Sequence, residues 1–201
     1  MKKLRILAAL VMSLLFTTAF AATEYYGRVA YGLKGNVKKM KRKSDSKFLK
    51  YMIPMKTKVG FTNDGRIKKS FMYYDADGYP LGLSSVAGDM YVMIDIRYDE
   101  MKRPAELISK TKHCLHGHGP TLISYKNQYS SSGEVEKCVI STLPDDGDGV
   151  ATPFAELDYD GYKYDAAGNW IERSVVINVY ENGELLEDGR YAETREIEYY
   201  Q

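Results

Sequence analysis

The sequence predicts an all-β protein, an antiparallel hairpin meander forming a twisted or partly closed sheet. Short units in which an aromatic residue is followed four positions later by glycine recur along the chain, and segments rich in Val, Ile, Tyr and Thr lie between them. No segment carries a sustained apolar stripe with the 3.6-residue period of a helix. With 201 residues, the chain is long enough to bury a core of its own without a metal or a dense disulfide framework.

The first 21 residues have the pattern of a secretory signal peptide. Three basic residues within the first five precede an apolar stretch, and Ala19-Phe20-Ala21 places small residues at the two positions that signal peptidase reads. A retained membrane anchor is the alternative, but the apolar stretch 6–22 is short for a bilayer. We therefore expect cleavage near Ala21, a single domain over residues 22–201, no remaining membrane span, and a periplasmic or secreted bacterial protein.

The turn units are the most informative internal repeat. An aromatic residue and a glycine recur at Tyr31/Gly35, Phe61/Gly65, Tyr74/Gly78, Tyr129/Gly133 and Tyr164/Gly168. Tyr98-Asp99 begins a sixth unit, in which Lys102 replaces the glycine. The recurrence predicts one kind of chain reversal used several times.

The residues of the unit suit a tight β-hairpin turn. The position after the aromatic carries an acceptor oxygen in most units, as in Asp75 and Asp165, and this oxygen can accept a hydrogen bond from the amide two residues on. Glycine at the fourth position adopts a positive φ without a Cβ clash. An apolar residue two positions later, Trp170 in the last unit, then begins the next strand.

Strand-like sequence flanks these turns. Strands are expected at residues 66–74, 90–98, 121–129, 134–142, 169–180 and 191–200. Asn182-Gly183 and Asp188-Gly189 predict two further turns. In the segment 37–51, a short helix remains open as an alternative.

The last unit resembles a known repeat. Tyr164-Asp165-Ala166-Ala167-Gly168-Asn169-Trp170 is similar to the tyrosine-aspartate (YD) repeat of RHS-type proteins, and to the final unit of small secreted bacterial proteins of uncharacterised function with degenerate YD-like repeats. The segments 61–67 and 74–78 resemble earlier units. The resemblance implies an antiparallel sheet that curls on itself and transfers no catalytic residue. Large RHS proteins build a shell around a toxin, whereas this chain is too short to enclose a second domain.

Export bears on the two cysteines, Cys114 and Cys138. In an oxidising compartment, two thiols in one chain predict a disulfide between them. Two buried free thiols are the alternative.

All three histidines lie close together, at His113, His116 and His118. Imidazoles so close could bind Zn²⁺ or Cu²⁺. In an extended segment only His116 and His118 share a face, and the neighbouring glycines favour a loop with solvent-exposed histidines instead. We expect no cofactor.

Charge is segregated along the chain. Residues 34–58 hold ten Lys and Arg and one acid, whereas residues 144–201 hold fifteen acids and four Lys and Arg. This pattern favours pairing of an early strand with a late one or two solvated faces. The alternative is a basic patch that docks on anionic cell-envelope sugars or lipids.

The sequence contains no catalytic motif that we recognise, and its net charge of +1 argues against a general nucleic-acid binder. We therefore expect a non-enzymatic interaction or scaffold module that presents an exposed Tyr-rich β surface to a protein or glycan partner. The alternative is a glycan- or metal-binding accessory protein, or a divergent hydrolase of the cell envelope.

Overall fold

The described part of the chain forms one sheet of antiparallel strands. The computed structural model describes residues 26–52, 55, 57–68, 71–87, 90–113, 121–144 and 150–201. The strands are β1 (Val37–Ser44), β2 (Lys58–Gly60), β3 (Phe71–Tyr74), β4 (Pro80–Ala87), β5 (Met90–Tyr98), β6 (Pro104–His113), β7 (Thr121–Tyr129), β8 (Val135–Leu143), β9 (Thr152–Tyr164), β10 (Trp170–Glu181) and β11 (Glu184–Tyr199). Two short helices accompany them, η1 (Val29–Tyr31) and α2 (Lys47–Met52).

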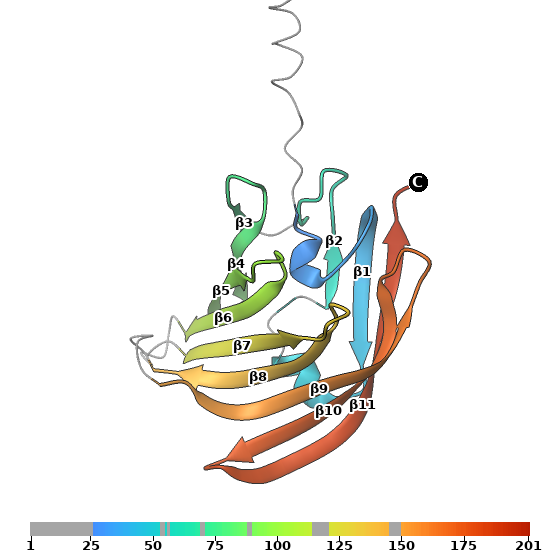
Figure 1. Cartoon of the computed structure of the whole chain (residues 1–201). Helices are drawn as coiled ribbons and strands as arrows, with labels where there is room; N and C mark the ends of the chain where they lie inside the picture. Colours follow the sequence, from blue (N-terminus) through green and yellow to red (C-terminus); the bar gives the residue numbers. More distant parts are fainter. Residues whose placement is uncertain are drawn as a thin grey trace, which may run out of the picture.

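The sheet is a meander whose last strand returns to the first. Strands β3 to β11 are neighbours in the order of the sequence, and β11 then pairs with β1, which pairs with β2 (Figure 1). Strands β2 and β3 are therefore the two edges of the sheet. The expected all-β hairpin meander is confirmed, and the expected strands 90–98 and 121–129 coincide with β5 and β7.

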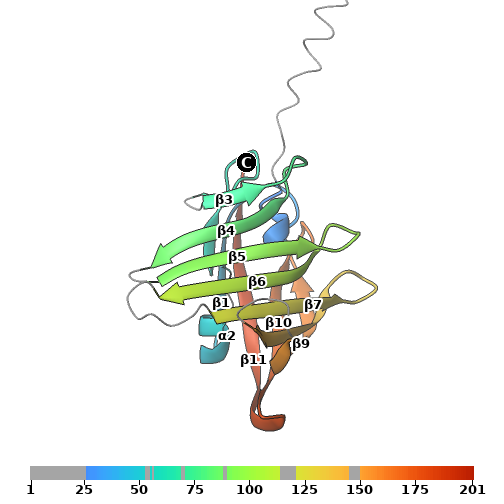
Figure 2. The same ribbon diagram turned by 90° about the vertical axis from the view of Figure 1, so that its left-hand side faces the viewer.

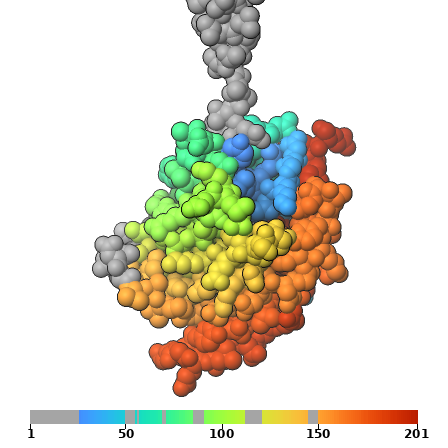
Figure 3. Space-filling view, viewed as in Figure 1, coloured from blue at the N-terminus to red at the C-terminus, as the bar shows by residue number. Residues whose placement is uncertain are grey.

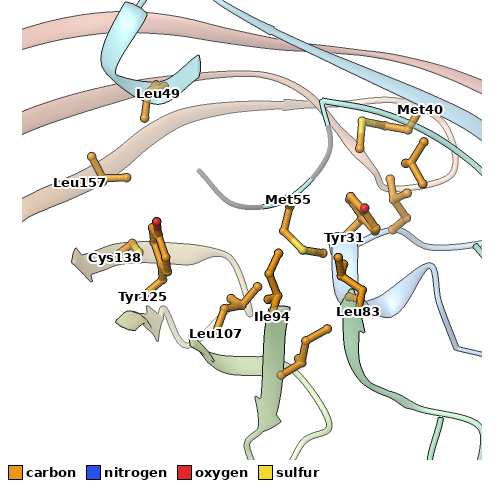
Figure 4. Close-up of a cluster of buried hydrophobic side chains, with 14 of the residues drawn as sticks. Tyr31, Met40, Leu49, Met55, Leu83, Ile94, Leu107, Tyr125, Cys138 and Leu157 are labelled. Carbon is orange, nitrogen blue, oxygen red and sulfur yellow. The ribbon is translucent and has the colours of Figure 1, made fainter. Parts of the chain in front are cut away.

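The sheet is strongly bent and places the core on its inner face. In Figure 2, strands β3 to β7 cross the direction of β1 and β11 behind them. Ile94, Leu157 and Ile177 are almost fully buried on this inner face. Figure 4 shows side chains from both flanks pointing toward one another, with Met55 between them and Leu49 of α2 on the side of Leu157.

Residues 26–36 bridge the two edges of the sheet. The buried guanidinium of Arg28 donates from Nε to the Val37 carbonyl at 2.9 Å and from Nη2 to the Thr62 carbonyl at 2.9 Å. The Tyr26 amide donates to the Gly78 carbonyl at 2.8 Å. Figures 1 and 3 show this blue segment between the green strands and β1. The segment thus links β1 to the turns at both edges.

The predicted turn occurs five times with one hydrogen-bond pattern. Each turn has four residues and begins with the residue after the aromatic. The amide of the first turn residue donates a hydrogen bond to the carbonyl of the residue four positions later. The carbonyl of the first turn residue accepts a hydrogen bond from the amide of the fourth. The fourth residues have φ between 59° and 94°, and they are Gly65, Gly78, Lys102, Gly133 and Gly168. The carboxylates of Asp75 and Asp165 accept the amides two residues on, as expected.

Two of the expected turns are wrong. Tyr31 and Gly35 do not connect two strands, because Tyr31 ends η1 and the chain first finds a partner strand at Val37. Asp188-Gly189 lies within β11, paired with β10. Asn182-Gly183, where both residues have positive φ, already reverses the chain, so the next residues are free to pair.

The segment 37–51 contains both a strand, β1, and a helix, α2.

The basic early segment pairs with the acidic late segment, as the charge pattern predicts. Strands β1 and β11 are antiparallel neighbours, joined by ion pairs from Lys38 to Glu198 at 2.6 Å and from Lys43 to Glu196. These pairs are half-exposed, so each contributes little energy, but together they favour this pairing over like-charge alternatives. Docking of the basic segment on anionic envelope molecules stays a prediction.

Several expectations fall outside the described residues. The signal peptide at residues 1–21 lies there, as do Cys114, His116 and His118. Within the described ranges, no helix is long and apolar enough to cross a lipid bilayer.

We expect Gly133→Ala to destabilise the protein by about 1–2 kcal/mol, because an L-residue in the left-handed region brings its Cβ close to the following carbonyl oxygen. The cost is a backbone cost, since the nearest atom to a Cβ at position 133 is Arg103 Nη1 at 4.0 Å. The control is Gly60→Ala in β2, where φ is not positive and the nearest contact is an ordinary 3.6 Å. It should change stability by less than about 0.5 kcal/mol. Equal effects in urea denaturation would contradict the turn geometry.

Candidate ligand pocket

A cavity of about 220 Å³ opens on the concave face of the sheet. Aliphatic side chains, among them Leu107 and Leu157, form part of its wall. The aromatic part of the wall consists of Tyr31, Tyr125, Tyr129, Tyr159, Tyr162, Tyr164 and Trp170, and polar and charged side chains complete the lining. A concave, mainly apolar site with a few polar groups has the general character of a small-molecule pocket.

The rim of the pocket is built from the β7–β8 turn, the β9–β10 turn and the segment after η1. The buried Asn169 side chain donates from Nδ2 to the Lys34 carbonyl at 2.9 Å and accepts the Lys34 amide at 2.7 Å. The Tyr164 hydroxyl donates to Glu134 Oε1 at 2.8 Å. These long-range hydrogen bonds hold the three segments in place around the opening.

A buried ion cluster lies in the wall beside the aromatic residues. Glu193 is fully buried, and its Oε2 accepts from Arg173 Nε at 2.7 Å and lies 2.5 Å from Arg173 Nη2. Arg42 Nε is 3.8 Å from the other carboxylate oxygen. One buried carboxylate therefore faces two guanidinium groups.

The arginines of this wall differ in electrostatic environment. Burial lowers the pKa of Arg173, but Glu193 and the neighbouring tyrosines outweigh it and raise the pKa overall. For Arg42, burial outweighs the attraction of Glu193, so the pKa falls. Burial, together with repulsion by Arg173 and Arg42, lowers the pKa of Arg195 well below its usual range.

Arg195 has few partners of its own. Its Nη2 donates to the Tyr31 carbonyl at 2.9 Å, while Nε and Nη1 are buried without a hydrogen-bond partner among the described residues. Its Cζ lies 3.7 Å from the centroid of the Trp170 ring, and Arg173 Cζ lies 4.2 Å from the same ring. The ring of Trp170 is thus contacted by two guanidinium groups, an arrangement that stabilises cations.

Two tyrosine hydroxyls of the wall donate hydrogen bonds to backbone carbonyls. Tyr129 donates to the Pro104 carbonyl at 2.9 Å, and Tyr162 donates to the Val135 carbonyl at 2.6 Å. Burial raises the pKa of Tyr129 to about 12, so this hydroxyl stays neutral near pH 7. The pocket thus presents fixed ring faces, neutral hydroxyls and cations, which are groups that can hold and orient a ligand.

Cys138 lines the pocket as a buried free thiol. Burial raises its pKa to about 12. Because Cys114 lies outside the described residues and Cys138 is free, the structure does not support the expected disulfide.

The structure brings part of the predicted turn set together. Those that line the pocket are Tyr31, Tyr129, Gly133, Tyr164, Gly168 and Trp170. The other predicted turn residues do not line the pocket, and they are Gly35, Phe61, Gly65, Tyr74, Asp75, Gly78 and Asp165.

Sequence reasoning missed the charged part of the wall. Arg173 occupies the same face of β10 as Val175 and Ile177, because side chains alternate along a strand. The alternation of this arginine with a valine and an isoleucine on one strand face was the feature of the sequence that indicated a buried guanidinium. Glu193 and Arg195 share a face of β11 in the same way.

The structure does not test the histidine cluster. His113 is the last residue of β6, and His116 and His118 lie outside the described residues. In the part of the chain that the structure describes, no three His, Cys, Asp or Glu residues are grouped to hold a metal ion.

No protein-family model and no curated protein matches this chain. A similar solved structure is a porin-like protein from Bacteroides uniformis, with a TM-score of 0.38 and 12% sequence identity over 70% of this chain and 64% of that one. The chain therefore spans less than two thirds of the length of that protein. The resemblance to YD repeats stays a prediction.

The state of Cys138 can be tested with a thiol reagent. In Cys114→Ser, the remaining thiol is expected to react with Ellman's reagent slowly in the native state and completely in denaturant, because it is buried and its pKa is about 12. The wild-type protein, purified from its export compartment and denatured without reductant, should release two equivalents of the chromophore. Zero equivalents would show that a disulfide forms and would contradict the free thiol.

The buried ion pair predicts a large coupling energy. Arg173→Met should destabilise the protein by about 3–5 kcal/mol, because the buried Glu193 carboxylate loses its hydrogen-bonded partner and keeps only Arg42, whose Nε lies 3.8 Å from the other oxygen. Glu193→Leu should also be costly, since it leaves Arg173 unpaired. The double variant is expected to lose less than the sum of the two, as urea denaturation of all four proteins would measure. Strictly additive losses would argue against the pairing.

Proposed function

We propose that this protein is a non-enzymatic binding protein of the bacterial periplasm or exterior, and that it holds a small ligand in the concave-face pocket. The observation that carries the proposal is the convergence of aromatic rings, guanidinium groups and rim hydrogen bonds from distant parts of the chain on one cavity. Walls held in place before binding lower the entropic cost of association. The signal-peptide pattern at residues 1–21 supports export.

The location of the tyrosines favours a pocket over a flat tyrosine-rich surface. Six tyrosines line the cavity. A glycan remains among the ligands to test, but the Trp170 ring, a common platform for sugars, is already contacted by Arg173 and Arg195.

A second candidate function is partner binding at the β3 edge. Among the described strands, β3 has a neighbour on one side only, and Phe71 and Tyr73 on it are 80% and 60% exposed. An extended peptide can add to such an edge and place side chains against the exposed rings. This role corresponds to an interaction module with an exposed aromatic surface.

The fluorescence of Trp170 offers a direct test, because this is the single tryptophan of the sequence. We expect at least one class in a panel of monosaccharides, aromatic acids, aromatic alcohols and medium-chain fatty acids to change its emission saturably and to raise the melting temperature. Val135→Phe places a ring at the pocket wall and should weaken binding at least about tenfold. Phe71→Ala, at the β3 edge, is the control and should bind as the wild type does.

Circular dichroism establishes that both variants are folded. If no panel member binds the wild type, the pocket loses its support. Binding that Phe71→Ala abolishes and Val135→Phe leaves intact would instead assign the ligand to the β3 edge.

A further inference from the structure

The charges around the pocket do not balance. The lining includes Lys34, Arg42, Arg173 and Arg195 against one carboxylate, Glu134, and Glu193 behind the wall adds a second. Glu134 accepts hydrogen bonds from the hydroxyls of Ser130, Ser132 and Tyr164. These bonds, led by that from Ser132, lower its pKa to about 2. The cavity thus lies in a region of net positive charge.

The excess of positive charge is greatest around Arg195. Its backbone position on β11 is directly opposite Arg42 on β1, so two like charges are cross-strand neighbours. The nearby Glu193 carboxylate is directly opposite Arg173 on β10 and is hydrogen-bonded to it. Two nitrogens of the Arg195 guanidinium are left buried without a hydrogen-bond partner among the described residues. Glu193 attracts Arg195, but this attraction does not outweigh burial and the repulsion by Arg173 and Arg42. A buried cation without a hydrogen-bonded counter-ion is costly, and an anion in the adjoining cavity would offset that cost.

The apolar part of the pocket wall indicates the chemical nature of the uncharged part of the ligand. Leu107, Leu157 and Met55 join the tyrosine rings in lining the cavity, so most of the surface that a ligand would touch is apolar. Such a wall favours a carbon skeleton, whereas the arginine side favours a negative head group.

We propose that the ligand of this pocket is an amphiphilic monoanion, a carboxylate on an aromatic ring or short alkyl chain, whose head group is bound on the Arg195 side. This inference rests on the proposed function and specifies its ligand class. Arg195 and Arg173 supply the positive field, Trp170 holds both guanidinium groups in position, and the tyrosine and leucine side chains enclose the apolar body.

The test compares acids with their uncharged amides of nearly the same shape. The probes are 4-ethylbenzoate against 4-ethylbenzamide, and octanoate against octanamide, titrated calorimetrically into the wild-type protein at pH 7. At least one acid should bind about tenfold more tightly than its amide, a preference that charge-assisted hydrogen bonding can supply. The two pairs distinguish an aromatic acid from a fatty acid as the source of the carboxylate.

Variants then locate the charge preference. Arg195→Gln should reduce the acid-to-amide ratio to about one, and Arg195→Lys should restore part of the ratio. Arg190→Gln is the matched control, because Arg190 is an exposed β11 arginine paired with Asp160 outside the pocket, and it should leave the ratio unchanged.

The outcomes separate this inference from the proposed function. Equal binding of acid and amide by the wild-type protein, which requires no variant to fold, would overturn the anion inference and leave the pocket intact. Binding of uncharged panel members alone would do the same. Absence of binding by every acid, amide and panel member would overturn both. If the folded Arg195→Gln variant still binds the acid about tenfold more tightly than the amide, Arg195 is excluded as the anion-binding residue.

Discussion

The pairing of β1 with β11 is the constraint on which the rest of the structure depends. A meander from β3 to β11 would by itself leave β11 as an open edge. When β1 covers that edge, it carries the preceding segment 26–36 across the inner face, where Arg28 and Asn169 secure it. The same pairing places Arg42 opposite Arg195, so the covering of the β11 edge and the charge of the pocket have one origin.

The repeated turn has a second consequence beyond reversing the chain. Four of the five units begin with a tyrosine that is the last residue of a strand, and the chain then reverses within a few residues. These units therefore place rings at corresponding positions of their hairpins. Tyr129 and Tyr164 come from two such units and both line the cavity. The turn units that form the hairpins therefore also supply aromatic residues of the pocket wall.

The interior combines an aliphatic core with a polar region, and the two differ in what they contribute. Ile94, Ile140 and Leu157 are buried among other apolar side chains and stabilise the fold by removing that surface from water. Arg173 and Glu193 are buried at a desolvation cost that their mutual hydrogen bonds offset only in part. Such a charged region is typical of sites where proteins recognise ligands.

What the sequence by itself determined is local: the all-β class, the turns at Gly65, Gly78, Gly133 and Gly168, the left-handed Lys102, and the complementary charge of β1 and β11. These follow from contacts within a few residues or from the average charge of long segments. Only the tertiary structure decided which strand faces meet, that Tyr31 ends a helix, and that Arg42, Arg173 and Arg195 share one wall with Trp170. Their juxtaposition depends on the curvature of the sheet and on the pairing of β1 with β11, which joins residues more than a hundred positions apart. No pattern within a few residues specifies that pairing.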